Sequence, residues 1–164
     1  MRIIGRAHCV LFAISVAAIP AAAEEDWDGW LFEKYQHPLT DATSYWAGAR
    51  SEDGEALAIL TCLSDGRVDF AVSGRAFIDP SRAYNTQIYW RDDTGQVVLS
   101  VFDPTEEGAL TTSPSIILRL TEAISAAKDR FVMQSKGGPK PAVFPVKDAS
   151  TAIGKFLDAC KLTP

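Results

Sequence analysis

Apolar and polar residues alternate along much of the first half of the chain, and three short polar turns separate the alternating segments. The turns are residues 51–54, 64–66 and 92–95, and each contains Asp and ends in Gly, two residue types that close hairpins. The pattern predicts strands at 42–50, 56–63, 68–73, 87–91 and 96–102. Residues 56–63 are apolar on both parities, so we expect a central strand that is covered on both faces.

The second half of the chain has two segments with helical spacing. Ser113 and Pro114 predict a helix start, with Ser as the N-cap and Pro at the first helical position. A second helix is expected from about Asp148, which can cap it, and this helix carries Cys160 on its apolar face. Two more strands are expected between the helices, at 130–134 and 142–146. This order predicts an α+β domain with a largely antiparallel sheet and two helices.

The first 23 residues have the order of parts of a secretory signal peptide. Arg2 and Arg6 form a basic start, residues 8–19 are mostly apolar, and three alanines end at Ala23. The apolar run is about a dozen residues, short of the roughly 20 that span a bilayer, so cleavage is favoured over an anchor. We expect residues 1–23 to be removed and residues 24–164 to be a single secreted domain without a membrane span. The alanine-rich signal favours a bacterial periplasm.

Secretion changes the meaning of the cysteines. The segment that follows the signal contains two, Cys62 and Cys160. In an oxidising compartment such a pair favours one disulfide. Cys62 belongs to the expected central strand and Cys160 to the last helix, so the bond would pin that helix onto the sheet. A redox-active pair is the alternative, although redox cysteines are usually close in sequence.

Composition and charge exclude several classes of function. The 164 residues carry 16 Lys and Arg against 21 Asp and Glu, a net charge of -5, which argues against a general nucleic-acid binder. The chain has two His and three Cys, too few for a zinc site made of several Cys and His after the signal is removed. The turns also lack the spaced acidic residues of a calcium loop. We therefore expect no metal and no cofactor.

The sequence offers weak candidates for catalysis. His37 is the one histidine after the signal, and no serine stands in a Gly-x-Ser-x-Gly elbow. Asp92 and Asp93 are adjacent carboxylates, but they fall in a hairpin turn, where Asp is expected for backbone reasons. We therefore expect a non-enzymatic protein. The alternatives are a hydrolase that acts on the cell wall through these carboxylates, and an inhibitor of a periplasmic enzyme.

Aromatic residues are the best candidates for binding, because Trp and Tyr gather in the first half of the segment that follows the signal. Exposed Trp and Tyr anchor protein partners or stack on sugar rings. Trp27 and Trp30, beside the acidic start of the secreted segment, are expected to be exposed. Arg91 lies near other aromatic residues and would pair with a carboxylate of a partner.

The order of these segments is also similar to a known group of proteins. The segment 38–41 (Pro-Leu-Thr-Asp) precedes an aromatic strand, an apolar strand ends in Cys62, the stretch 88–93 (Ile-Tyr-Trp-Arg-Asp-Asp) follows, and the final helix ends in Cys160. The chain thus resembles the small periplasmic accessory proteins associated with type VI secretion, of the TagO and VasI kind. The resemblance implies a disulfide-bonded, non-catalytic envelope component whose partner is another envelope protein. Arg91 and Asp93 match the Arg-x-Asp of this group, with Asp92 where an apolar residue is usual.

Overall fold

The described chain folds into one antiparallel sheet and two helices. The structure is a computed structural model that describes residues 27–78, 86–91 and 95–162. The expected signal peptide, residues 1–23, lies outside them. The strands are β1 (Leu31–Gln36), β2 (Thr43–Arg50), β3 (Ala56–Cys62), β4 (Val68–Gly74), β5 (Thr86–Arg91), β6 (Val97–Pro104), β7 (Gly108–Thr111), β8 (Arg130–Ser135) and β9 (Ala142–Pro145). The helices are α1 (Pro114–Ala126) and α2 (Ala149–Cys160). The prediction of an α+β fold is confirmed.

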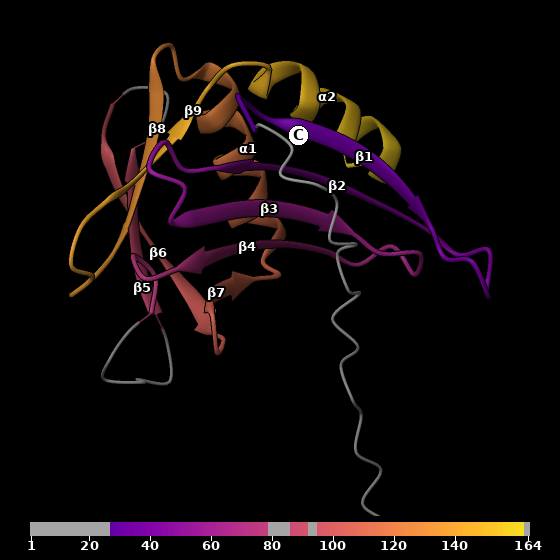
Figure 1. Cartoon of the computed structure of the whole chain (residues 1–164), viewed down its shortest axis with the longest axis horizontal. Helices are drawn as coiled ribbons and strands as arrows, with labels where there is room; N and C mark the ends of the chain where they lie inside the picture. The colour runs from indigo at the N-terminus through magenta and orange to yellow at the C-terminus, as the bar shows by residue number, and fades with distance from the viewer. Residues whose placement is uncertain (1–26, 79–85, 92–94, 163–164) are drawn as a thin grey trace, which may run out of the picture.

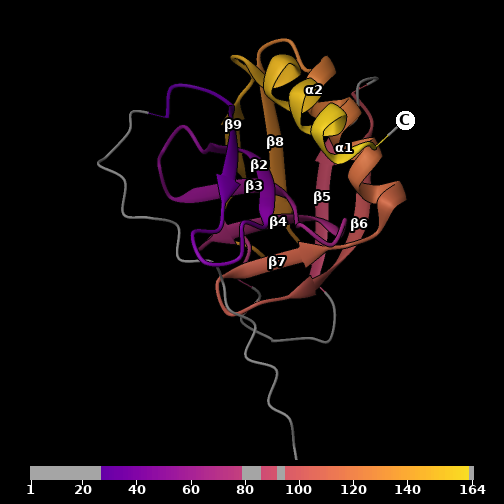
Figure 2. The same ribbon diagram turned by 90° about the vertical axis from the view of Figure 1, so that its right-hand side faces the viewer.

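The strand order is β1-β2-β3-β4-β7-β6-β5-β8-β9, and every neighbouring pair is antiparallel. β1 to β4 follow one another as hairpins, and β5 to β7 form a meander that runs back toward them, so that β7 pairs with β4. The sheet is strongly curled. In Figure 1 β2, β3 and β4 run across the view, whereas β5, β6 and β8 run nearly upright. Figure 2 shows the two helices side by side over the strands.

The helices and the curled sheet enclose one hydrophobic core. α2 packs on β1, β2 and β3 and against α1, and α1 packs on β4. Residues from both halves of the sheet alternate inward, as the period of a strand requires. The large side chains that fill the core are Leu60, Phe70, Ile88, Trp90, Phe102, Phe131, Met133, Phe144 and, from the helices, Ile117, Leu120, Ile124 and Phe156.

The two ends of the curled sheet meet along a seam between the β2 side and β9. The Trp30 backbone N–H donates to the Lys147 carbonyl at 2.9 Å, and the Glu52 N–H donates to the Val143 carbonyl at 2.8 Å. Lys140 Nζ lies 2.8 Å from a carboxylate oxygen of Asp53. Lys140 Nζ is also 2.8 Å from Glu55. Main-chain bonds and a small ion-pair cluster thus hold the seam.

The expected strands and helices all form, with bounds shifted by a few residues, but two short strands escape the sequence pattern. β1 and β7 were not expected. Most of β1 is exposed and half of its residues are polar, so it shows no buried alternation. β7 begins at Gly108, where any side chain would collide with the Val72 carbonyl of β4. In β3 the outward residues are half-buried, which corrects the expectation of full cover on both faces.

The expected helix caps are also corrected in part. Ser113 occupies the N-cap of α1 and Pro114 follows it, but the Ser113 hydroxyl makes no capping bond and lies 3.1 Å from the Ser115 hydroxyl instead. Asp148 precedes α2 with a φ of 59°, in the left-handed region, and its carboxylate makes no capping bond either. An N-cap side chain reaches the first turn from an extended backbone, which Asp148 does not have.

Candidate functional site

Three side chains form an aromatic cluster on the outer face of the sheet: Trp27, Trp46 and Arg50. Trp46 and Arg50 are both outward residues of β2, and the outward position between them is Gly48, which adds no side chain. Trp27 stacks on Trp46 with ring centroids 5.5 Å apart and planes inclined by 16°. The Arg50 guanidinium carbon lies 5.7 Å from the centroid of the Trp27 ring. Both Trp rings stay partly exposed and Arg50 is exposed.

A half-buried carboxylate lies in the same region of the outer face. Trp46 of β2 pairs with Thr61 of β3, and Thr61 pairs with Asp69 of β4, so these three side chains form a row across the strands. Burial raises the pKa of Asp69, and a hydrogen bond with Thr61 and the charge of Arg67 lower it only in part. Removal of the charged form from water is the physical cause of the net rise. The row therefore places Asp69, a carboxylic acid with a raised pKa, beside the aromatic cluster.

The expectation that Trp30 is exposed is wrong. Only 2% of its surface is accessible, and its indole Nε1 donates to the Pro145 carbonyl at 2.9 Å. Its backbone N–H also bonds Lys147, which follows β9. Trp30 therefore closes the seam of the sheet and is not free to bind a partner. Trp27, three residues earlier, stays partly exposed.

Arg91 and Asp93 were expected to contribute to a partner-binding surface, and of the two only Arg91 lies within the described residues. Arg91 ends β5, is exposed, and donates from Nη1 to the Gly95 carbonyl at 2.8 Å. The ring and cation contacts of Trp27 within the described residues are with Trp46 and Arg50, and none is with Arg91. Asp92 and Asp93 lie outside the described residues. His37 stands in the turn after β1, where its Nδ1 accepts the Leu39 N–H at 3.2 Å.

The two cysteines are brought together, as the sequence led us to expect. Cys62 is the buried last residue of β3 and Cys160 the partly buried last residue of α2. The two side chains are 2.6 Å apart, which is longer than a disulfide bond of about 2.05 Å, and the structure holds them as thiols. Burial raises the pKa of the Cys160 thiol, and the contact with Cys62 raises it further.

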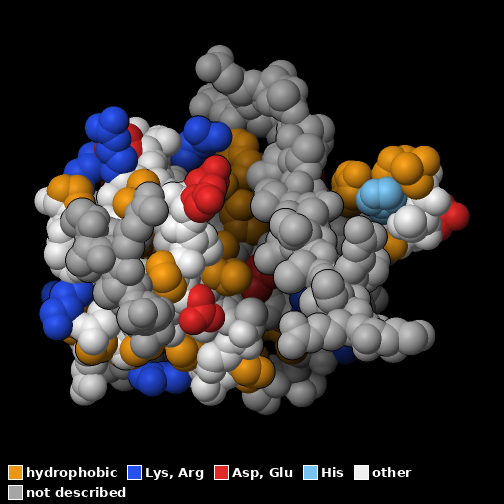
Figure 3. All heavy atoms as spheres, turned by 90° about the horizontal axis from the view of Figure 1, so that it is seen from below, with side chains coloured by type: hydrophobic (Ala, Val, Ile, Leu, Met, Phe, Trp, Pro, Cys, Tyr) orange, Lys and Arg blue, Asp and Glu red, His pale blue; other side chains and the backbone are white. Residues whose placement is uncertain are grey.

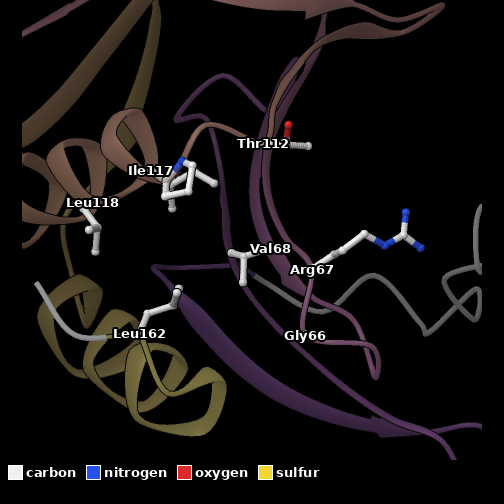
Figure 4. Close-up of a pocket in the computed structure, with 8 residues that line it drawn as sticks. Gly66, Arg67, Val68, Thr112, Ile117, Leu118 and Leu162 are labelled. Atoms are coloured by element: carbon white, nitrogen blue, oxygen red, sulfur yellow. The ribbon is translucent and has the colours of Figure 1, made fainter.

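A cavity of about 380 Å³ opens beside this cysteine pair, between the start of β4 and α1. Val68, Ile117, Leu118 and Leu162 point toward its interior in Figure 4. The guanidinium of Arg67 points away from it, and Arg67 Nε bonds Asp65 at 2.7 Å. The cavity thus offers apolar contact without an inward charge.

Two surface features were not singled out as sites from the sequence. The partnership of Trp46 and Arg50 with Trp27 depends on the β2 register and on the path of the chain before β1. The second feature, here called the β6 stripe, consists of Val97, Leu99 and Val101, which are outward residues exposed by about half. Its signal was present, because residues 97–102 are apolar on both parities except at Ser100.

Neither a cluster of metal-binding side chains nor a membrane-spanning helix occurs among the residues that the structure describes. No group of three or more His, Cys, Asp or Glu side chains there is placed to hold a metal ion. Neither helix of the described ranges is long and apolar enough to cross a membrane. Searches of protein-family models, curated proteins and solved structures gave no match to the chain.

Proposed function

We propose that the chain is a secreted, non-enzymatic accessory module of the cell envelope, which acts by binding another envelope protein through the aromatic cluster. The signal-like residues 1–23 support the periplasmic location. The resemblance to accessory proteins of type VI secretion supports the kind of partner. The aromatic cluster carries the proposal, because it offers a surface suited to that role.

The composition and order of the cluster explain why it suits a protein partner. Trp and Arg are the residues that contribute most to binding energy at protein interfaces. Trp27 stacks on Trp46 and lies under the Arg50 guanidinium, so its side chain loses little conformational freedom when a partner binds. Arg50 keeps polar N–H groups exposed, which suit a carboxylate or carbonyl of the partner. A preordered aromatic surface with a cationic edge is a specific docking point.

We also propose that Cys62 and Cys160 form a disulfide in the secreted protein. Their side chains are already in contact, and the two residues join β3 to α2. Cys62 is buried and Cys160 is partly buried, which suits a structural bond better than a redox pair, because reactive redox cysteines are accessible to solvent. Intact mass tests the bond: alkylation without reduction should add no label, whereas two labels on the unreduced protein would refute it.

The function is tested by quantitative capture from the periplasm with a C-terminal tag and a reversible crosslinker. We expect one saturable protein partner for the wild type, and at least about a tenfold loss for Trp27→Ala, as is typical of an interface hot spot. Arg50→Glu should give a similar loss. The matched control is Leu39→Ala, which removes an apolar side chain that is 89% exposed. Figures 1 and 3 show its turn, between β1 and β2, projecting away from the body.

Circular dichroism must show that all variants keep the wild-type fold. Equal capture of the same partner by Trp27→Ala, Arg50→Glu and the wild type would refute the cluster as the binding surface. Absence of any saturable partner would refute the accessory role itself.

A further inference from the structure

The β6 stripe exposes three large apolar side chains in a row on one face of β6. Val97 is 60% exposed, Leu99 48% and Val101 48%. Ser100 and Phe102, on the opposite face of β6, are buried, with 7% and 1% of their surface exposed. That face of β6 packs into the core, so the stripe is not needed to fill it. Contiguous exposed apolar residues on a folded surface mark an interaction site. The stripe lies on β6, four strands away from β2 in the sheet order, and is separate from the aromatic cluster.

The neighbours of the stripe are arranged with opposite charges at its two ends. On the neighbouring strand β5, Tyr89 stands opposite Leu99 and Arg91 opposite Val97. β5 and β6 contain one charged residue each: Arg91 at the end beside Val97, and Asp103 two residues beyond Val101. Both side chains are exposed, and neither forms an ion pair within the described residues.

We propose that the β6 stripe binds a second copy of this chain, face to face, about a twofold axis that crosses the strands at Leu99. The outward residues read Val-Leu-Val, the same in both directions from Leu99. The rotation therefore places Val97 over Val101 of the second copy and Leu99 over its own equivalent. The same rotation brings the Arg91 end of each copy to the Asp103 end of the other. A patch that is complementary to itself is what a twofold dimer requires.

The size of the patch sets the strength of the dimer. With strands about 4.8 Å apart and a rise of about 3.4 Å per residue, six residues on each of β6, β5 and β8 cover roughly 300 Å² of sheet. Stable interfaces bury about 800 Å² on each partner. An interface of this size belongs to the weak, transient class, so we expect a reversible dimer.

Sedimentation equilibrium of the secreted chain, from about 1 to about 500 µM, tests the proposal over the range that a weak interface requires. We expect a monomer–dimer equilibrium for the wild type and at least about a tenfold larger dissociation constant for Leu99→Arg. Arg91→Glu and Asp103→Arg should each weaken the dimer, because each places like charges together. The double variant Arg91→Glu/Asp103→Arg should recover most of the affinity, because the swapped charges face each other again.

Two controls keep the result specific. Leu39→Arg places the same cation on a different exposed apolar residue, and Trp27→Ala removes the aromatic cluster; both should dimerise like the wild type. A wild type that stays monomeric at the highest concentration would overturn the proposal, as would an unchanged constant for folded Leu99→Arg or no recovery in the double variant. A monomer that still captures its partner through Trp27 would leave the proposed function standing while refuting the dimer.

Discussion

Asp69, on the outer face of the sheet, makes the stability of the fold depend on pH. Burial favours its neutral form and raises its pKa above the ordinary 3.8, so the folded state binds its proton more tightly than the unfolded state does. Stability from this residue is therefore greatest in acid and falls as the pH rises from 3.8 through the raised pKa. At neutral pH the ionised carboxylate is a cost that the fold has to bear.

We predict that Asp69→Asn stabilises the protein at pH 7, by on the order of 0.5 kcal/mol, because the amide keeps a hydrogen bond with Thr61 without a buried charge. Urea unfolding at several pH values measures the effect. The gain should shrink toward zero below pH 3.8, where Asp69 is neutral in both states. A gain of equal size at all pH values would contradict this explanation.

Trp27 and Trp30 show what the sequence can and cannot predict at this scale. Both lie in the same short stretch, and their residue type marks them as candidate anchors. Trp30 is the buried one because it donates hydrogen bonds to Pro145 and Lys147, which lie 115 and 117 positions later in the chain. No local pattern contains that information, so the sequence predicts the pair of candidates and only the fold separates them.

At the scale of elements, α2 is held against the sheet by its apolar face and, in our proposal, by the bond from Cys160 to Cys62. The two cysteines are 98 positions apart, so the bond closes a long loop in the unfolded chain. The chain-entropy model gives such a loop about 4.7 kcal/mol of stabilisation, less any native strain.

We predict that reduction lowers the Tm of the secreted protein by roughly 10 °C, because it releases this constraint on the unfolded state. Calorimetry with and without reductant measures the shift. The variant Cys62→Ala/Cys160→Ala should melt near the reduced wild type and should ignore reductant. An unchanged Tm for the wild type would contradict a stabilising bond.

Strands and helices with a buried periodic face were predictable, because the buried face imposes a period of 2 or 3.6 on the sequence. The short strands β1 and β7, which pair with their neighbours mainly through main-chain hydrogen bonds, were not predictable in this way. β1 exposes most of its side chains, and β7 has four residues and begins at a glycine. The cysteine contact was predictable because the patterns placed Cys62 and Cys160 on inward faces of their elements.

At the scale of the whole molecule, the seam decides whether the curled sheet stays closed. Hydrogen bonds from Lys140, Ser51 and the Glu55 backbone hold the pKa of Asp53 well below its ordinary 3.8. Asp53 and Glu55 raise the pKa of Lys140 above its ordinary 10.5. The stabilisation from Asp53 is present above pH 3.8 and is lost as the pH falls below it, and that from Lys140 is lost as the pH rises above 10.5.

We predict that Lys140→Met lowers the Tm at neutral pH. The loss should disappear in strong acid, because Asp53 is then protonated and the wild type has no Lys140–Asp53 ion pair to lose. Thermal unfolding across the pH range tests this. Lys136→Met makes the same change of charge in the same loop between β8 and β9, where Lys136 has no ion pair within the described ranges, and should leave the Tm unchanged. An equal loss from both variants would show that net charge, and not the seam, is responsible.

The central claim is that the aromatic cluster contacts another envelope protein. The most direct measurement is site-specific photo-crosslinking in living cells, with a photoreactive residue in place of Glu33 or, as the control, in place of Leu39. Glu33 is exposed and stands beside Trp46 on β1, so this change keeps all three side chains of the cluster. The account predicts one dominant adduct of defined mass from position 33, and no such adduct from position 39. No adduct from position 33, or the same adducts from both positions, would contradict it.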